Sequence, residues 1–125
     1  MRFLIQYGAV LGVVLALDAI WLGFLAKGFI REHLGYLMAP QVQWWAAAVF
    51  YLLFTLGIVI FVIPLGGGSL TRVIMYGALF GLVAYGTYDL TNQAVIRDWP
   101  VVMTVTDMIW GAVLTAVAAA VGSLV

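Results

Sequence analysis

The sequence predicts an all-α protein: a four-helix transmembrane bundle with a short interfacial amphipathic helix in the first loop. Of its 125 residues, 66% are hydrophobic and 8% are charged, whereas soluble domains average about 45–50% apolar and about 25% charged residues. Four segments also reach the length of about 20 mostly apolar residues that crosses the hydrocarbon core of a bilayer. These segments lack the alternation of apolar and polar residues that membrane-spanning strands show.

The four spans are expected to form a single integral membrane domain over residues 1–125, at about residues 3–25, 42–63, 71–96 and 100–125. Pro40 suits the first turn of the second span, and Pro64 is expected to end it. Asp98 precedes the fourth span and is expected to cap its N-terminus.

The first loop, Lys27 to Gln41, is longer than the other connections. Its apolar residues recur at helical spacing, which predicts a short amphipathic helix on the bilayer surface, with an irregular loop as the alternative. These apolar residues are Phe29, Ile30, Leu34, Leu37 and Met38. Three tryptophans near the ends of spans are expected at the membrane interface: Trp44, Trp45 and Trp99.

The composition excludes several classes of function. A chain this apolar is neither a soluble enzyme nor a disordered tail, and its zero net charge gives no basic surface for nucleic acid, so no nucleic-acid partner is expected. Without cysteine it has no disulfide or thiolate chemistry, and its one histidine makes no multi-histidine metal site. Positive charges divide evenly between the two sides of the predicted bundle, so the positive-inside rule leaves the orientation open.

Three aspartates in three different spans are predicted to lie at one depth. Asp18 lies nine residues before Lys27, and Asp89 lies eight before Arg97. Asp107 lies nine residues after Asp98, and Lys27, Arg97 and Asp98 are all expected at the same membrane boundary. At about 1.5 Å of rise per residue, each carboxyl group lies roughly 12–14 Å inside the bilayer boundary.

Burying three such groups in a bilayer is unfavourable whether the carboxyl groups are charged or protonated. A charged Asp at the centre of a span costs about 2.5–3.5 kcal/mol on insertion scales. Protonating a free Asp at pH 7 costs about 4 kcal/mol, because its reference pKa is near 3.9. The three groups are therefore expected to share protons or hold a cation in an acidic pocket inside the bundle, unless they only form a structural polar network.

Aromatic and amide side chains accompany the aspartates at helical spacing. On the third span, positions 85, 88, 89 and 92 follow the pattern i, i+3, i+4 and i+7, which places them on one face. The candidate site for a ligand or cation comprises Asp18, Asp89, Asp107, Asn92, Tyr88, Tyr85, Trp21, Trp110 and Tyr51. If a metal binds there, the expected ligands are Asp18, Asp89 and Asp107, since Mg²⁺ and Ca²⁺ prefer oxygen ligands.

Two motifs carry a resemblance to a known family. They are Thr87-Tyr88-Asp89-Leu90-Thr91-Asn92 and the later stretch Thr106 to Gly111. In these motifs and over nearly the whole chain, the sequence resembles an uncharacterised family of small bacterial four-span integral membrane proteins, classed as a predicted membrane protein with a domain of unknown function. The resemblance implies a multi-pass protein of the bacterial inner membrane. It implies neither a reaction nor a cofactor.

Three functions are compatible with this pattern. The first is a binding or transport module whose acidic pocket holds a proton or cation and a small apolar or cationic solute. The second is a membrane-embedded enzyme that acts on a lipid-like substrate with Asp acid/base groups or an Asp-held metal, and the third is an assembly partner of another membrane protein. Besides the lipid bilayer, the expected partner is a second copy of the chain, through the small-residue faces Gly8/Gly12 or Gly77/Gly81.

Overall fold

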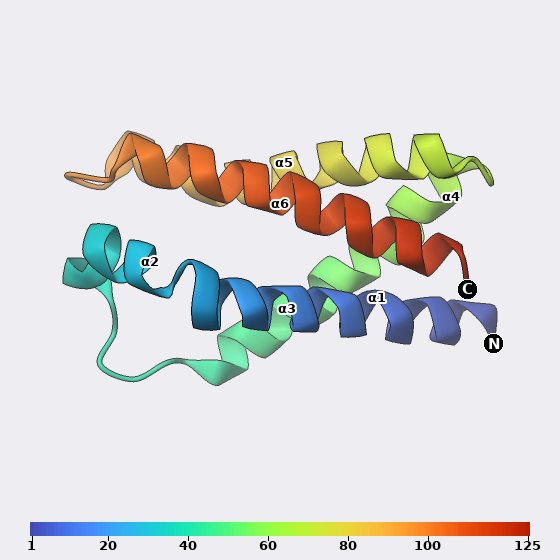
Figure 1. Ribbon diagram of the computed structural model, residues 1–125, viewed down its shortest axis with the longest axis horizontal. Helices are drawn as coiled ribbons and strands as arrows, with labels where there is room; N and C mark the ends of the chain where they lie inside the picture. Colours follow the sequence, from blue (N-terminus) through green and yellow to red (C-terminus); the bar gives the residue numbers. More distant parts are fainter.

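The computed structural model describes residues 1–125 and contains helices and no strands, which confirms the predicted fold class. Four helical stretches are long and apolar enough to cross a membrane. They are Arg2–Leu25, which joins α1 (Arg2–Ile20) to η1 (Trp21–Leu25); Trp44–Gly66, which joins α3 (Trp44–Gly57), η3 (Ile58–Val62) and α4 (Ile63–Gly66); α5 (Leu70–Val95); and α6 (Val101–Ser123). Both termini lie at the same end of the bundle, as an even number of crossings requires (Figure 1).

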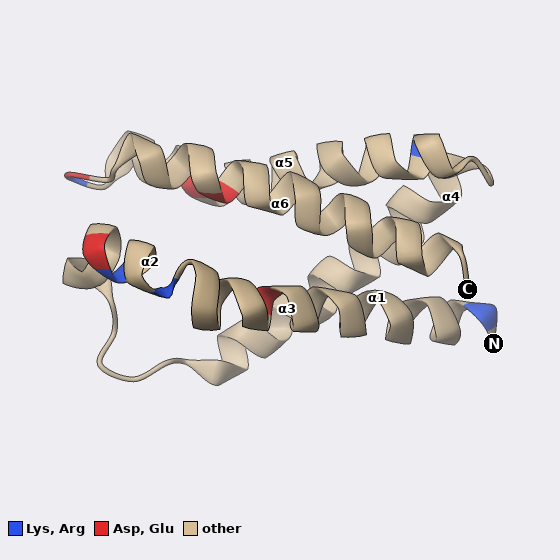
Figure 2. Cartoon of the chain, in the orientation of Figure 1, with Lys and Arg blue, Asp and Glu red and all other residues tan.

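The surface of the bundle is apolar. Only 24 of the 125 residues are buried, and the large exposed side chains include many leucines, isoleucines and phenylalanines. A buried cluster joins the long helices, and its members are Val10, Val14, Phe54, Ile58, Val59, Val62, Val73, Leu114, Ala118 and Ala119. Because water would disfavour so much exposed apolar surface, the outside of this bundle suits lipid. Charged residues lie mostly at the two ends, with acidic segments part-way along α1 and α6 (Figure 2).

Helices α5 and α6 pack closely because α5 carries glycines on the shared face. A Cβ atom added at Gly77 would lie 3.0 Å from the carbonyl oxygen of Thr115. A Cβ atom at Gly81 would overlap the backbone of Gly111. The prediction that Gly77/Gly81 is a face for a homodimer is therefore wrong, since α6 of the same chain covers it.

The other small-residue face is open. A Cβ atom at Gly8 or Gly12 would meet no other atom within 4 Å. Homodimer formation through this face of α1 stays a prediction.

Two membrane helices contain a wider turn. In η1, the Ala26 amide donates to the Trp21 carbonyl at 2.7 Å, a spacing of five residues instead of four. The second wide turn, η3, comes just before Pro64, whose ring has no N–H and would crowd the carbonyl four residues earlier. The wide turn accommodates Pro64 within the helix. The expectation that Pro64 ends the span is therefore wrong, because the helix continues to Gly66.

The first loop contains the expected short helix, α2 (Lys27–Leu34), followed by a 3₁₀ turn, η2 (Gly35–Leu37). The hydroxyl of Tyr36 donates to the carbonyl oxygens of Arg97 and Asp98 at 3.2 and 3.1 Å. This contact holds the loop against the turn between α5 and α6 (Figure 1). Pro40 lies in the non-helical segment before α3, so its predicted place in a first helical turn is wrong.

The turn between α5 and α6 differs from the expectation at two residues. Asp98 has a positive φ of 61° and is not a cap, because the N-cap position of α6 belongs to Pro100. The side chain of Trp99 is only 5% exposed, and its Nε1 donates to the Thr104 hydroxyl at 3.0 Å. Trp99 is thus buried in the bundle rather than exposed at the membrane interface, whereas Trp44 and Trp45 are exposed.

Candidate functional site

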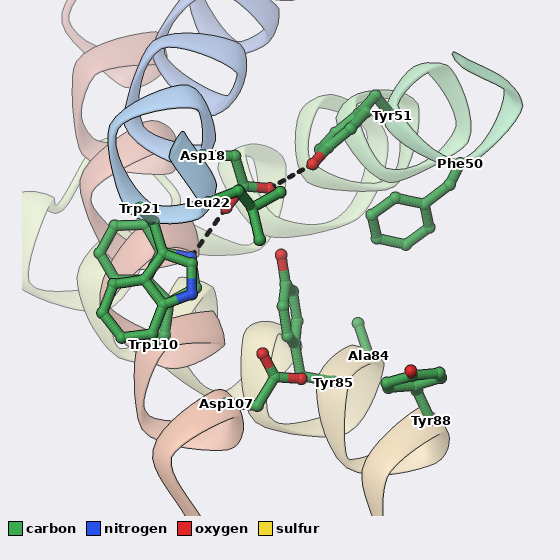
Figure 3. Close-up of a pocket in the computed structure, with 10 residues that line it drawn as sticks. All are labelled: Asp18, Trp21, Leu22, Phe50, Tyr51, Ala84, Tyr85, Tyr88, Asp107 and Trp110. Carbon is green, nitrogen blue, oxygen red and sulfur yellow. Dashed lines mark hydrogen bonds between the residues drawn. The ribbon is translucent and has the colours of Figure 1, made fainter. Parts of the chain in front are cut away.

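A cavity of about 310 Å³ lies among the helices that carry the predicted site. Its walls come from α1 with η1, from α3, from α5 and from α6 (Figure 3). The lining residues are Asp18, Trp21, Leu22, Phe50, Tyr51, Ala84, Tyr85, Tyr88, Asp107 and Trp110. They include two carboxyl groups and six aromatic rings, and no Lys, Arg or His.

The carboxyl group of Asp18 is held by two donors from other helices. Tyr51 on α3 donates its hydroxyl to Oδ2 at 2.6 Å, and Trp110 on α6 donates Nε1 to Oδ1 at 2.8 Å (Figure 3). Asp18 is only 5% exposed, so these two bonds compensate for much of the water that its carboxyl group lacks.

Aromatic stacking fixes one wall of the cavity. The ring of Trp21, in the wide turn η1, stacks on Trp110 with a centroid distance of 4.6 Å and an interplanar angle of 8°. Stacked indoles present a flat, rigid surface and keep Nε1 of Trp110 directed at Asp18.

Tyr85 on α5 reaches into the cavity across a glycine of α6. A Cβ atom at Gly111 would overlap the Tyr85 ring, so only glycine leaves room for that ring. The Tyr85 hydroxyl points toward the Asp18 side of the cavity, and Asp107 lies beside the ring (Figure 3). Phe50 packs edge-on against Tyr85, with centroids 6.5 Å apart.

Asp89 lies behind the cavity and not in its wall. Its side chain is fully buried at 0% exposure, and neither carboxyl oxygen has a hydrogen-bond partner. On α6, the Thr104 hydroxyl lies 3.4 Å from the Asp89 backbone oxygen, and Asp107 follows Thr104 by about one helical turn. The structure therefore places Asp18 and Asp107 at the cavity surface and Asp89 behind Asp107.

The chain matches, over residues 3–124, the family described as Predicted membrane protein (DUF2177). It belongs to this family. No curated protein and no solved structure matches it. With four helices able to span a bilayer, this member of DUF2177 is a multi-pass integral membrane protein. The predicted resemblance to an uncharacterised family of membrane proteins is thereby confirmed.

In this DUF2177 chain, seven of the nine predicted site residues line the cavity. The two others are Asp89, which lies behind it, and Asn92, which lines a neighbouring groove of about 510 Å³ beneath α2 and η2. Tyr88 lines both the cavity and this groove.

Three lining residues were missed by the sequence analysis. Leu22 follows Asp18 by one helical turn, and Ala84 precedes Tyr88 by one turn, so helical spacing could have identified both. Phe50 carries no such signal, because it neighbours Tyr51 directly and adjacent residues point in different directions on a helix.

A three-aspartate metal site is not assembled in this DUF2177 chain. No group of three His, Cys, Asp or Glu side chains lies close enough to hold one metal ion. The physical reason is the separation between Asp18, which its own donors hold on one side of the cavity, and Asp89, which is enclosed between α5 and α6.

Proposed function

We propose that this protein binds a small organic cation in the cavity, in a binding or transport role within the membrane. One observation carries the proposal: two carboxyl groups, Asp18 and Asp107, line an aromatic-walled cavity that no basic side chain enters. A positively charged solute supplies the missing counter-charge.

The aromatic wall suits an organic cation better than a hydrated metal ion. A cation over the face of a Trp or Tyr ring gains about 0.5–1 kcal/mol when exposed and about 2 kcal/mol or more when desolvated. Rings of Trp21, Tyr51, Tyr85 and Trp110 surround the cavity. Its volume of about 310 Å³ lies at the small end of the range of ligand pockets.

Asp107 is the carboxyl group that we assign to the ligand. Asp18 already accepts two hydrogen bonds, from Tyr51 and Trp110. Asp107 is half-buried at the cavity surface, and no hydroxyl, indole or amide group donates a hydrogen bond to its carboxyl group. A bound ammonium group beside it would offset the cost of a charge inside the bilayer.

Two other functions receive less support. An assembly partner would turn its acidic side chains outward to meet another membrane protein, but Asp18 and Asp89 are buried inside the bundle. A membrane-embedded enzyme needs a nucleophile or an activated water beside the acids, and the cavity wall is otherwise aromatic and aliphatic. A structure with a lipid-like molecule bound in the cavity, with its reactive bond beside Asp107, would favour the enzyme.

The proposal is tested by titrating purified protein in lipid nanodiscs with benzyltrimethylammonium while recording tryptophan fluorescence. Stacked Trp21 and Trp110 are in the cavity wall, so a bound ligand is expected to change the emission. The matched neutral ligand is neopentylbenzene, which has the same shape without the charge. We expect the cation to bind at least tenfold more tightly than the neutral analogue.

The matched variants are Asp107→Asn and Asp98→Asn, since each removes one carboxylate with little change in shape. Asp107 lines the cavity, whereas Asp98 lies in the turn between α5 and α6. We expect at least a tenfold loss of affinity in Asp107→Asn and none in Asp98→Asn. Equal affinity in both variants, or equal binding of the neutral analogue, contradicts the proposal.

A further inference from the structure

Asp89 is the most completely enclosed ionisable side chain in the bundle, and it is separate from the cavity wall. Its exposure is 0%, and both carboxyl oxygens are without a hydrogen-bond donor. A buried carboxylate in this state would keep its full desolvation penalty, because no partner replaces the water that it has lost.

A hydrogen-bonded network between α5 and α6 reaches the backbone of Asp89 but not its carboxyl group. Nε1 of Trp99 donates to the Thr104 hydroxyl at 3.0 Å, and that hydroxyl lies 2.9 Å from Oε1 of Gln93. Nε2 of Gln93 in turn donates to the Trp99 carbonyl at 2.9 Å. The Thr104 hydroxyl also lies 3.4 Å from the backbone oxygen of Asp89, and not from its carboxyl group. These hydrogen bonds close a ring between α5 and α6, and none of them is donated to the carboxyl group of Asp89.

The titratable side chains on the turns of α5 and α6 beside Asp89 are Tyr85 and Tyr88 on α5 and Asp107 on α6. Across the cavity lie Asp18 on α1 and Tyr51 on α3, which are hydrogen-bonded to each other. None of these groups is basic. On α6, the Thr104 hydroxyl lies 3.4 Å from the Asp89 backbone oxygen and the Met108 side chain packs at Gly86, so Asp107, between them in the sequence, lies on the turn beside Asp89. Two ionised carboxylates are both acceptors, so a hydrogen bond between them requires a proton on one.

We propose that Asp89 keeps its proton at neutral pH and donates it in a hydrogen bond to Asp107. The inference rests on the proposed function, because it makes Asp89 a positioning residue for the carboxylate that meets the ligand. The proton stays on the Asp89 carboxyl oxygen, and Asp107 accepts the hydrogen bond as the anion. The pair then carries a single negative charge, located at the cavity surface. Asp89 orients Asp107 without touching the ligand.

The first test needs no ligand. Infrared spectra of the protein in nanodiscs at neutral pH are expected to show the C=O stretch of a protonated carboxylic acid, which an ionised carboxylate lacks. This band should disappear in Asp89→Asn and remain in Asp98→Asn, the matched control in the exposed turn. Absence of the band in the wild type overturns the inference, as does a band that survives in Asp89→Asn. Either result leaves the proposed function standing.

The second test distinguishes whether Asp89 acts as a hydrogen-bond donor to Asp107 or as an anion. In Asp89→Asn, the amide N–H can replace the donated proton, so the affinity for benzyltrimethylammonium should stay within about threefold of wild type. Asp89→Leu keeps the branched shape and has no donor, so affinity should fall at least tenfold while circular dichroism shows an unchanged helix content. If Asp89→Asn loses affinity as fully as Asp107→Asn, the side chain acts as an anion and the inference is wrong. If the wild type itself fails to bind the cation, the proposed function fails, and the infrared band still decides the inference.

Discussion

Single atoms decide how closely α5 and α6 approach each other. A Cβ atom at Gly81 would overlap the backbone of Gly111 and lie 2.6 Å from the Thr115 hydroxyl. Neither neighbour can rotate away, because one is main chain and the other donates to the Gly111 carbonyl at 2.7 Å. Small residues at such positions allow van der Waals packing, which drives helix association in lipid.

Gly81→Ala should therefore destabilise the protein by about 1–3 kcal/mol, the usual cost of overpacking. Thermal unfolding of the purified protein in detergent, followed by circular dichroism, measures the change. Gly8→Ala is the matched control, because its new methyl group would meet nothing within 4 Å. Equal destabilisation by both substitutions would contradict the packing described for α5 and α6.

A second residue-scale prediction concerns the donors to Asp18. Tyr51→Phe removes the 2.6 Å hydrogen bond and leaves the carboxyl group with Trp110 alone. Leaving a buried acceptor oxygen without its donor costs about 1–3 kcal/mol, so the same unfolding measurement should show a clear decrease in stability. Tyr76→Phe is the control, since Tyr76 is 40% exposed and its hydroxyl contacts no carboxyl group. An unchanged stability in Tyr51→Phe would mean that Asp18 does not depend on this bond.

Among the elements, the loop that contains α2 and η2 is attached to the rest of the bundle by few polar contacts. The hydroxyl of Tyr36 bridges to the carbonyl oxygens of Arg97 and Asp98. Through this contact the loop lies over the turn between α5 and α6, beside the groove that Tyr88 shares with the cavity.

Tyr36→Phe should loosen this loop without affecting the membrane helices. Hydrogen exchange read by mass spectrometry is expected to accelerate at amides 27–43 and stay unchanged in α5 and α6, because local opening follows the loss of local contacts. Tyr76→Phe again serves as the control. Faster exchange throughout the bundle would show instead that Tyr36 supports the whole fold.

At the scale of the whole molecule, the arrangement of the four helices fixes which loops share a side of the membrane. Both termini lie at one end, and the first loop and the turn between α5 and α6 lie at the other (Figure 1). The even division of positive charges leaves open which end faces the cytoplasm.

Cysteine labelling tests this arrangement directly, because the natural chain has no cysteine. Leu124→Cys and Gln41→Cys place single thiols at opposite ends, at exposed positions. A membrane-impermeant maleimide added to sealed vesicles should label one of them from outside, and the other only after the vesicles are opened. Labelling of each in about half of the molecules would indicate insertion in both orientations. Complete labelling of both from the same side contradicts a four-span topology.

Much of the candidate site could be predicted from helical spacing and depth. Aspartates at equal distances from one membrane boundary, with aromatic residues three or four positions away, identified seven residues of the cavity wall. The spacing could not separate Asp89 from Asp107, because depth says nothing about rotation around the helix axis. Trp99 was misassigned for a related reason: its position at the end of a span suits both the interface and a buried hydrogen bond to Thr104.

The sequence by itself determined the membrane environment and the four long helices, because these follow from local composition and length, and it predicts one depth for the three aspartates from the rise of a helix. Only the tertiary structure decided which aspartates face the cavity, that Tyr51 of α3 supports Asp18, and that Gly77 and Gly81 pack within the chain. The helices are apolar on nearly all sides, so hydrophobic periodicity does not fix their rotation. Packing between the helices fixes it, through close contacts and buried hydrogen bonds between residues far apart in the sequence.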